Sequence, residues 1–338
     1  MARSKRFKVQ WGVAWYHLYN HVAACVGEYP LSKPAAARKL LALFQFYASV
    51  YECALAAVCV MGNHYHVVAR FERFLVMSRK ELMKRAKMLN AGPLGEKRLE
   101  CWGDEDWARF NRRLFDVSEF MKDVQQRFSV WYNARYKRRG YFWGDRFKAT
   151  VLDGPSTALG AVVYAELNPV RAGLVRRPED HRYSSCFLRS AGKAEWLMDL
   201  SQLTGIAEAE EAKRYYRSML YWCGAVKTRE KKGVIPEEIV RAEEARGFAE
   251  RGCFRRRIGY YRDGLAVGCS EFVIKMLARA RDAGIFRRRK HPLRGRGPEC
   301  CLRAYRMASE ASVRPDNQAT VDPGGVPDPV PTAPGYGR

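Results

Sequence analysis

The stretch VMGNHYHVVARF, residues 60 to 71, decides the first part of the fold. An apolar run leads into this stretch, Gly62 and Asn63 interrupt it, and a second run with two valines follows. This pattern predicts two strands joined by a two-residue hairpin loop with a primed turn. Side chains two residues apart on a strand share a face, so His64 and His66 would lie side by side. The spacing suits a metal-binding pair, and it also suits a strand whose polar face simply carries two histidines.

Hydrophobic periodicity and turn residues predict the other elements. A strand is expected over 11–26, a helix from Pro34 to near Tyr51, and an irregular segment over 91–115. Further helices are expected over 78–89, from a capping box of Asp116 and Glu119, over 156–168, and over 206–223, 236–250 and 270–283, with a strand over 146–152. Short connections between strands favour an α+β fold with an antiparallel central sheet and flanking helices.

Composition changes along the chain and predicts three regions. Residues 1–190 hold the mixed strand and helix pattern, residues 195–310 read as a basic helical accessory region, and the proline-rich residues 311–338 as a disordered tail. The basic cluster at 286–297 fits a solvated loop or a phosphate contact.

The 338-residue chain is strongly basic, with 60 Lys and Arg against 36 Asp and Glu and a formal net charge of +24. Such a field attracts polyanions, of which nucleic acid is the commonest. No apolar run of membrane-spanning length and no secretion signal are present, so we expect a cytoplasmic, nucleoid-associated protein without membrane contact. Ten cysteines without a C-x-x-C pattern are expected to be reduced thiols.

The segment RYKRRGYFWGDRFKATVLD, residues 135 to 153, interleaves cations with aromatic rings. This mixture suits phosphates and unstacked bases, whereas the alternative is a solvated loop that leads into a strand. We expect Phe142 to take part in stacking and predict these nucleic-acid contacts: Arg135, Lys137, Arg138, Arg139, Tyr141, Trp143, Arg146 and Lys148.

The helix expected over 156–168 stops at Asn168, because the following Pro169 disfavours a helical conformation at the residue before it. Tyr164 and Asn168 are four residues apart, so both lie on one face of the last turn. A tyrosine in a helix is usually half-buried packing, but this one shares its face with an amide that could bind a metal.

Three blocks together resemble a known family. The segments MGNHYHVV, RRGYFWGDRFKATVLD and YAELNPVRAGLV are similar, in the same order, to blocks of the single-tyrosine HUH transposases, in the form typical of REP-associated tyrosine transposases. The resemblance covers roughly residues 15 to 185. This sequence departs from the pattern at Tyr65, which is larger and more polar than the usual residue between the two histidines.

The resemblance implies a ferredoxin-like HUH nuclease fold and a specific chemistry. His64, His66 and Asn168 match the metal ligands and Tyr164 matches the nucleophile, with Mg²⁺ or Mn²⁺ as the ion. The implied activity is cleavage and rejoining of single-stranded hairpin DNA through a covalent 5′-phosphotyrosine. The implied partner is single-stranded or hairpin DNA, and the protein would be a monomer or a homodimer.

Two other functions fit the residues. A metal-dependent hydrolase could use the H-x-H pair for Zn²⁺, but it needs further ligands, and only four other histidines exist: His17, His21, His181 and His291. A domesticated, non-catalytic protein could use the same fold to hold nucleic acid, and this alternative stays open.

Overall fold

The computed structural model describes residues 8–9, 12–25, 27–227, 233–248, 264–285, 293–294 and 302–305. Its strands are β1 (Ala14–His21), β2 (Cys53–Val60), β3 (His64–Phe71), β4 (Lys148–Leu152), β5 (Gly264–Gly268), β6 (Leu293–Arg294) and β7 (Leu302–Tyr305). Its helices are η1 (Pro30–Ser32), α1 (Pro34–Val50), α2 (Arg79–Leu89), α3 (Pro93–Glu100), α4 (Asp104–Leu114), α5 (Val117–Arg135), α6 (Pro155–Glu166), α7 (Asn168–Arg171), η2 (Pro178–Asp180), α8 (Ser185–Ser190), α9 (Leu200–Thr204), α10 (Ala209–Ala225), α11 (Glu237–Glu244) and α12 (Ser270–Asp282).

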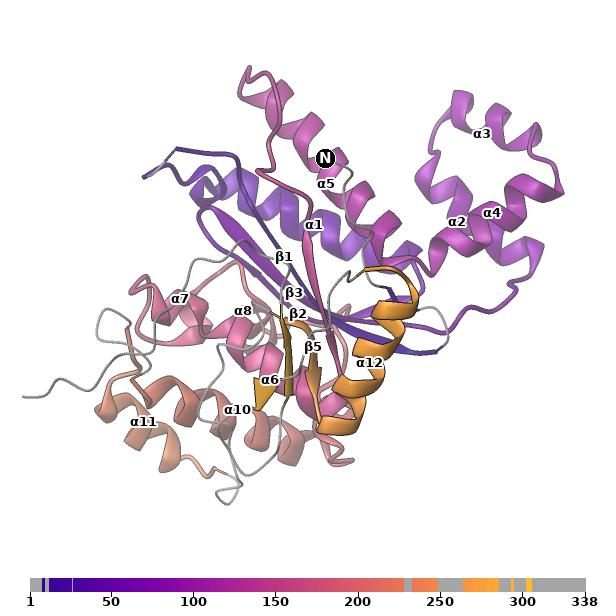
Figure 1. The fold of residues 1–338 in the computed structure, drawn as a ribbon. Helices are drawn as coiled ribbons and strands as arrows, with labels where there is room; N and C mark the ends of the chain where they lie inside the picture. Colours follow the sequence, from indigo (N-terminus) through magenta and orange to yellow (C-terminus); the bar gives the residue numbers. More distant parts are fainter. Residues whose placement is uncertain are drawn as a thin grey trace, which may run out of the picture. The chain divides into compact units, whose positions relative to one another are not determined.

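The predicted α+β class with an antiparallel central sheet is confirmed. One sheet has the strand order β2-β3-β1-β4-β5-β7-β6, and the pairs β2–β3, β3–β1 and β1–β4 are all antiparallel. The chain order β1-α1-β2-β3-α5-β4, with β1 and β3 central, is the ferredoxin-like arrangement, here with three further helices between β3 and α5 (Figure 1).

The two faces of this sheet carry different cores. Tyr16, Leu18, Tyr65 and Val67 face the first core, which also contains the buried residues of α1 and α5. Trp15 and Val68, one position along the same strands, belong to a second core with residues of α6, α9, α10 and α11. Strand alternation therefore sends Tyr65 toward α1 and α5 and its neighbours His64 and His66 toward α6.

The hairpin between β2 and β3 forms with the predicted two-residue loop, but the prediction of a primed turn is wrong. Primed turns require a positive φ, and neither Gly62 nor Asn63 has one. The loop is instead held by its neighbours, because its two carbonyl groups accept hydrogen bonds from the backbone of Leu31 and Val22. A Cβ on Gly62 would lie 2.9 Å from Cδ1 of Tyr29, so this turn is shaped by packing.

Two other local predictions are corrected. The first strand is shorter than 11–26, because it ends at His21 and only Val22 continues as a single bridge to Trp143. Residues 91–115 are not irregular but contain α3 and α4. Pro93 occupies the first turn of α3, so this proline marks the start of a helix. Trp107, Phe110 and Leu114 form the buried face of α4.

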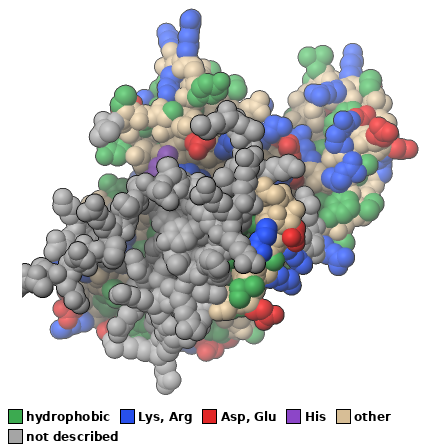
Figure 2. All heavy atoms as spheres, viewed as in Figure 1, with side chains coloured by type: hydrophobic (Ala, Val, Ile, Leu, Met, Phe, Trp, Pro, Cys, Tyr) green, Lys and Arg blue, Asp and Glu red, His purple; other side chains and the backbone are tan. Residues whose placement is uncertain are grey.

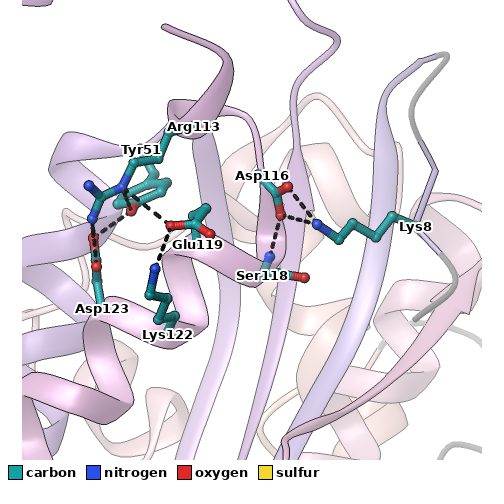
Figure 3. A network of polar contacts seen from close by, with 8 residues as sticks. All are labelled: Lys8, Tyr51, Arg113, Asp116, Ser118, Glu119, Lys122 and Asp123. Atoms are coloured by element: carbon teal, nitrogen blue, oxygen red, sulfur yellow. Dashed lines mark hydrogen bonds and ion pairs between the residues drawn. The ribbon is translucent and has the colours of Figure 1, made fainter. Parts of the chain in front are cut away.

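The predicted capping box before α5 is only half formed. The Asp116 carboxylate accepts a hydrogen bond from the Ser118 backbone and contacts Lys8 at 2.6 Å, so it caps the helix (Figure 3). Glu119 instead pairs with Arg113 at 3.7 Å and with Lys122 at 3.3 Å. These ion pairs fix the start of the helix whose other end leads to the basic segment.

The C-terminal part of the described chain extends the same sheet. β5 pairs with β4 in parallel, and the Cys269 backbone donates a hydrogen bond of 2.9 Å to Asp153. The helices predicted over 206–223, 236–250 and 270–283 are found as α10, α11 and α12, although residues 249–250 lie outside the described part. The tail 311–338 and most of the basic cluster at 286–297 also lie outside it, and the predicted domain boundaries stay predictions.

Two further observations concern the described residues. The seven cysteines described there are all free thiols, as expected. None of the helices described is long and apolar enough to cross a membrane.

Candidate active site

Four histidines gather on the sheet face that α6 covers. In the register of β1 and β3, His21 lies opposite His64 and Tyr19 lies opposite His66. The rings of His21 and His64 are 5.0 Å apart between centroids, and those of His64 and His66 are also 5.0 Å apart. The predicted pair His64 and His66 thus shares one face, and β1 adds His17 and His21 beside it.

The Nδ1 atom of each histidine of the pair lies in a hydrogen bond. Nδ1 of His64 lies 2.7 Å from Oδ1 of Asn63, an atom that can only accept. The proton of a neutral His64 ring therefore sits on Nδ1, and Nε2 keeps its lone pair. Nδ1 of His66 lies 3.0 Å from Nε2 of His17, and both of these side chains are buried.

Tyr164 reaches the histidines from α6. Its ring lies edge-on to His66, with centroids 5.4 Å apart and planes at 79°, and edge-on to His17 at 5.6 Å and 84°. Every residue from 161 to 170 is buried except Tyr164 and Asn168, which are partly exposed. One chain therefore brings a partly exposed tyrosine ring beside the buried rings of His66 and His17.

Asn168 lies next to Tyr164 but in a different helix from the one predicted. α6 ends at Glu166 and Asn168 begins α7, so the expected single helix over 156–168 is corrected. Nδ2 of Asn168 donates to the carbonyl oxygen of Tyr164 at 2.8 Å. The amide nitrogen is thereby engaged with α6, and Oδ1 is the amide atom suited to a metal ion.

A buried carboxylate anchors α6 and was not found from the sequence. Glu166 is fully buried and accepts hydrogen bonds from the hydroxyl groups of Ser185 and Tyr216, and Arg189 lies 3.3 Å away. Burial raises the pKa of Glu166, while Arg189, Ser185 and Tyr216 act in the opposite direction. These partners come from α8 and α10, so the network holds the Tyr164 helix against its neighbours.

Some of the predicted nucleic-acid contacts are exposed side chains, and the others have contacts within the protein. Arg135, Lys137, Arg139, Tyr141 and Arg146 are exposed, and Tyr141 is 91% exposed. Figure 2 shows Lys and Arg side chains gathered at the tip formed by the end of α5 and the segment that follows it. Lys137 adopts a φ of 49°, the left-handed conformation that favours glycine, so a cation is kept at a strained position.

The remaining residues of this segment have internal contacts. Arg138 donates to the Ala23 carbonyl oxygen at 3.0 Å, and Trp143 donates to the Gln125 carbonyl oxygen at 3.1 Å. Phe142 is 1% exposed, so the expectation that it stacks on bases is wrong. Trp143 packs against Tyr65, and the ring best placed for a base is therefore Tyr141.

Lys148 belongs to the site by its strand position. It starts β4 opposite Tyr19, and its ammonium group lies 5.7 Å from the centre of the Tyr19 ring. The ring of Tyr19 lies 5.9 Å from that of His66. A cation thus stands two side chains away from the histidine pair, between the pair and the basic segment.

The candidate metal ligands are two imidazoles and one amide oxygen. Within the described parts of the chain, no group of three His, Cys, Asp or Glu side chains is arranged to hold a metal ion. Zinc hydrolase sites need three or more such ligands. Two imidazoles and the Asn168 amide oxygen would leave a bound Mg²⁺ or Mn²⁺ ion with positions for water and phosphate oxygen atoms.

Comparisons with known proteins give one structural likeness. No family model and no curated protein matches the chain. The chain is similar to a solved structure described as "Structure of the REP associates tyrosine transposase bound to a REP hairpin", with a TM-score of 0.37 and 15% sequence identity, over 62% of this chain and 97% of that one. At this TM-score the likeness establishes neither family nor function.

Proposed function

We propose that the protein is a metal-dependent endonuclease and strand transferase that acts on single-stranded, hairpin-containing DNA. The observation that carries this proposal is the Tyr164 ring lying edge-on to His66, 5.4 Å away, at a partly exposed position of an otherwise buried segment. A tyrosine that only fills the core would not need two histidine rings edge-on to its own ring. The sequence blocks that resemble HUH transposases contain the same residues.

In the proposed reaction, Tyr164 is the nucleophile. Its phenolic oxygen forms a bond to phosphorus while the bond from phosphorus to the 3′ oxygen breaks, and the phenolic proton ends on the departing 3′-hydroxyl group. The product is a 5′-phosphotyrosine and a free 3′ end, so the reverse step can join another 3′ end. A divalent ion bound at this site would polarise the scissile phosphate.

The chain's own residues prepare this step. His64 and His66 would bind the ion through Nε2, and Asn168 would bind it through Oδ1. The Glu166 network holds α6, and therefore Tyr164, against α8 and α10. Since all of these groups belong to one chain, we propose that Tyr164 acts with the histidines of its own subunit.

The basic tip would hold the DNA. Arg135, Lys137, Arg139 and Arg146 offer charge for phosphates, and the exposed Tyr141 ring offers a surface for an unpaired base. Lys148, near Tyr19, would contact phosphate closest to the histidines. We therefore propose preference for unpaired over fully paired DNA.

The experiment is a covalent-capture assay. The full chain is incubated with a labelled single-stranded oligonucleotide that contains a hairpin, with and without Mn²⁺, and an SDS-resistant adduct is sought. The expected adduct requires Mn²⁺, is absent in Tyr164→Phe and maps to the peptide that contains Tyr164. If hairpin DNA binds with a steep salt dependence but no adduct forms under any condition, the non-catalytic binding protein is the correct alternative.

A further inference from the structure

His17 lies at the centre of the candidate site, although neither the H-x-H pattern nor the family resemblance includes it. It is fully buried on β1, opposite Val68 of β3 and two residues along that strand from His66. Its Nε2 atom is 3.0 Å from Nδ1 of His66, and its ring meets the Tyr164 ring edge-on at 5.6 Å. His17 therefore contacts both the expected metal-binding ring and the expected nucleophile.

The simplest alternative is a histidine that only fills the core. A buried imidazole loses its contacts with water, which costs free energy unless its polar atoms find partners. One partner of His17 is another imidazole, and the donor and acceptor of this hydrogen bond are not fixed by geometry alone, since either ring nitrogen can carry the proton. The proton position has a chemical consequence for His66.

Only one of the two proton arrangements lets His66 bind a metal ion through Nε2. If His17 donated to Nδ1 of His66, the neutral His66 ring would carry its proton on Nε2 and could not coordinate there. If Nδ1–H of His66 donates to Nε2 of His17, the lone pair of His66 is on Nε2. His64 already has this arrangement through Asn63 at 2.7 Å. Metal-binding histidines usually donate their second ring N–H to an acceptor in this way.

We propose that His17 is a positioning residue that accepts the Nδ1–H hydrogen bond of His66, fixes the His66 tautomer whose lone pair is on Nε2, and holds the ring of Tyr164 beside it. This inference rests on the proposed function for its metal, but the tautomer of His66 is a property of the protein alone. His17 itself touches neither the ion nor the DNA.

The test compares three single variants of the full chain. His17→Phe keeps a flat ring of similar size and removes the acceptor. His17→Gln keeps an acceptor oxygen near the position of Nε2. Tyr16→Phe is the matched control, because the neighbouring Tyr16 is equally buried, points to the opposite face and loses one polar atom that accepts from the Val9 backbone at 2.9 Å.

Two measurements are made besides cleavage. Titration calorimetry with Mn²⁺ alone gives the metal affinity, and long-range ¹H–¹⁵N NMR of histidine-labelled protein without metal gives the His66 tautomer. We expect His17→Phe to weaken Mn²⁺ binding about 10- to 100-fold. We also expect it to move the His66 proton away from Nδ1. His17→Gln should restore most of both, and Tyr16→Phe should change neither.

Circular dichroism shows which variants are folded, and the His17→Gln comparison is decisive if His17→Phe unfolds. The inference is overturned if His66 of the unmodified chain carries its proton on Nε2, or if folded His17→Phe binds Mn²⁺ like the unmodified chain. The proposed function fails separately, when the unmodified chain shows the expected tautomer and Mn²⁺ affinity but forms no adduct with any single-stranded hairpin.

Discussion

Replacing Glu166 tests whether the buried network on α6 sets the position of Tyr164. Glu166→Ala removes the acceptor of the Ser185 and Tyr216 hydroxyl groups and the ion-pair partner of Arg189. Each buried donor left without an acceptor costs about 1–3 kcal/mol. Removing one partner of a buried ion pair typically costs about 3–5 kcal/mol in total. Arg189 keeps its bonds to the carbonyl oxygens of Ala56 and Met198, so the lower end of that range is expected.

Glu166→Gln separates charge from shape. The amide keeps one carbonyl oxygen for Ser185, so we expect a loss of only about 1–2 kcal/mol. Urea unfolding of the full chain, followed by tryptophan fluorescence and circular dichroism, measures both losses. The rate of adduct formation, measured below the unfolding transition, should fall in both variants, because Tyr164 is two residues away on the same helix. An Ala variant as stable and as active as the unmodified chain would refute this account.

The pH dependence of stability follows from the same group. Burial raises the folded-state pKa of Glu166 above its ordinary value near 4.5. A raised carboxyl pKa means that the folded state binds the proton more tightly than the unfolded state. This contribution is complete below the unfolded pKa and is lost as pH rises through the folded pKa. The difference in stability between the unmodified chain and Glu166→Gln should therefore change with pH from about 4.5 upward, in the direction that favours the unmodified chain at low pH.

Three further predictions concern the nucleophile, the DNA tip and the sheet extension. Mixing Tyr164→Phe with His64→Ala should restore no adduct, because Tyr164 lies beside His66 of its own chain, whereas recovery of adduct would show catalysis between subunits. Tyr141→Ala should weaken binding of hairpin DNA with an unpaired arm by about 1–3 kcal/mol and leave duplex binding nearly unchanged, while Tyr141→Phe keeps the ring and the affinity. Gly268→Ala places a Cβ 2.2 Å from Cβ of Asp153 and should destabilise the fold by about 1–3 kcal/mol, seen as a lower melting temperature, whereas unchanged melting would mean that β5 contributes little.

Period-two alternation explains why much of the site could be predicted from the sequence. Residues 64 and 66 had to share a face of β3, and the structure places them there. The same alternation on β1 places His17, Tyr19 and His21 on one face, which indicates a second row of polar aromatic side chains. The register that brings them beside β3 is a pairing of distant segments, which no local pattern specifies.

Other features depended on tertiary contacts. Glu166 occupies a position of an apolar helix where a carboxylate is unexpected, and its partners lie 19 to 50 residues further along the chain. Trp143 reads like a nucleic-acid contact beside its basic neighbours, yet its ring packs on Tyr65 and its indole N–H donates to α5. The sequence of a basic and aromatic segment does not show which of its rings will be buried in the core.

The residue between the two histidines shows why the register of this hairpin matters for the chemistry. Tyr65 is fully buried against Phe44 on the α1 face and accepts a hydrogen bond from Gln125 at 2.7 Å. A shift of β3 by one residue would bury both histidines there and turn Tyr65 toward Tyr164. The Tyr65 side chain therefore disfavours the shifted register, since its hydroxyl group accepts the Gln125 hydrogen bond only when it lies on the α1 face. The H-Y-H sequence thus places one polar aromatic in the core and, by the same alternation, holds two imidazoles in the candidate site.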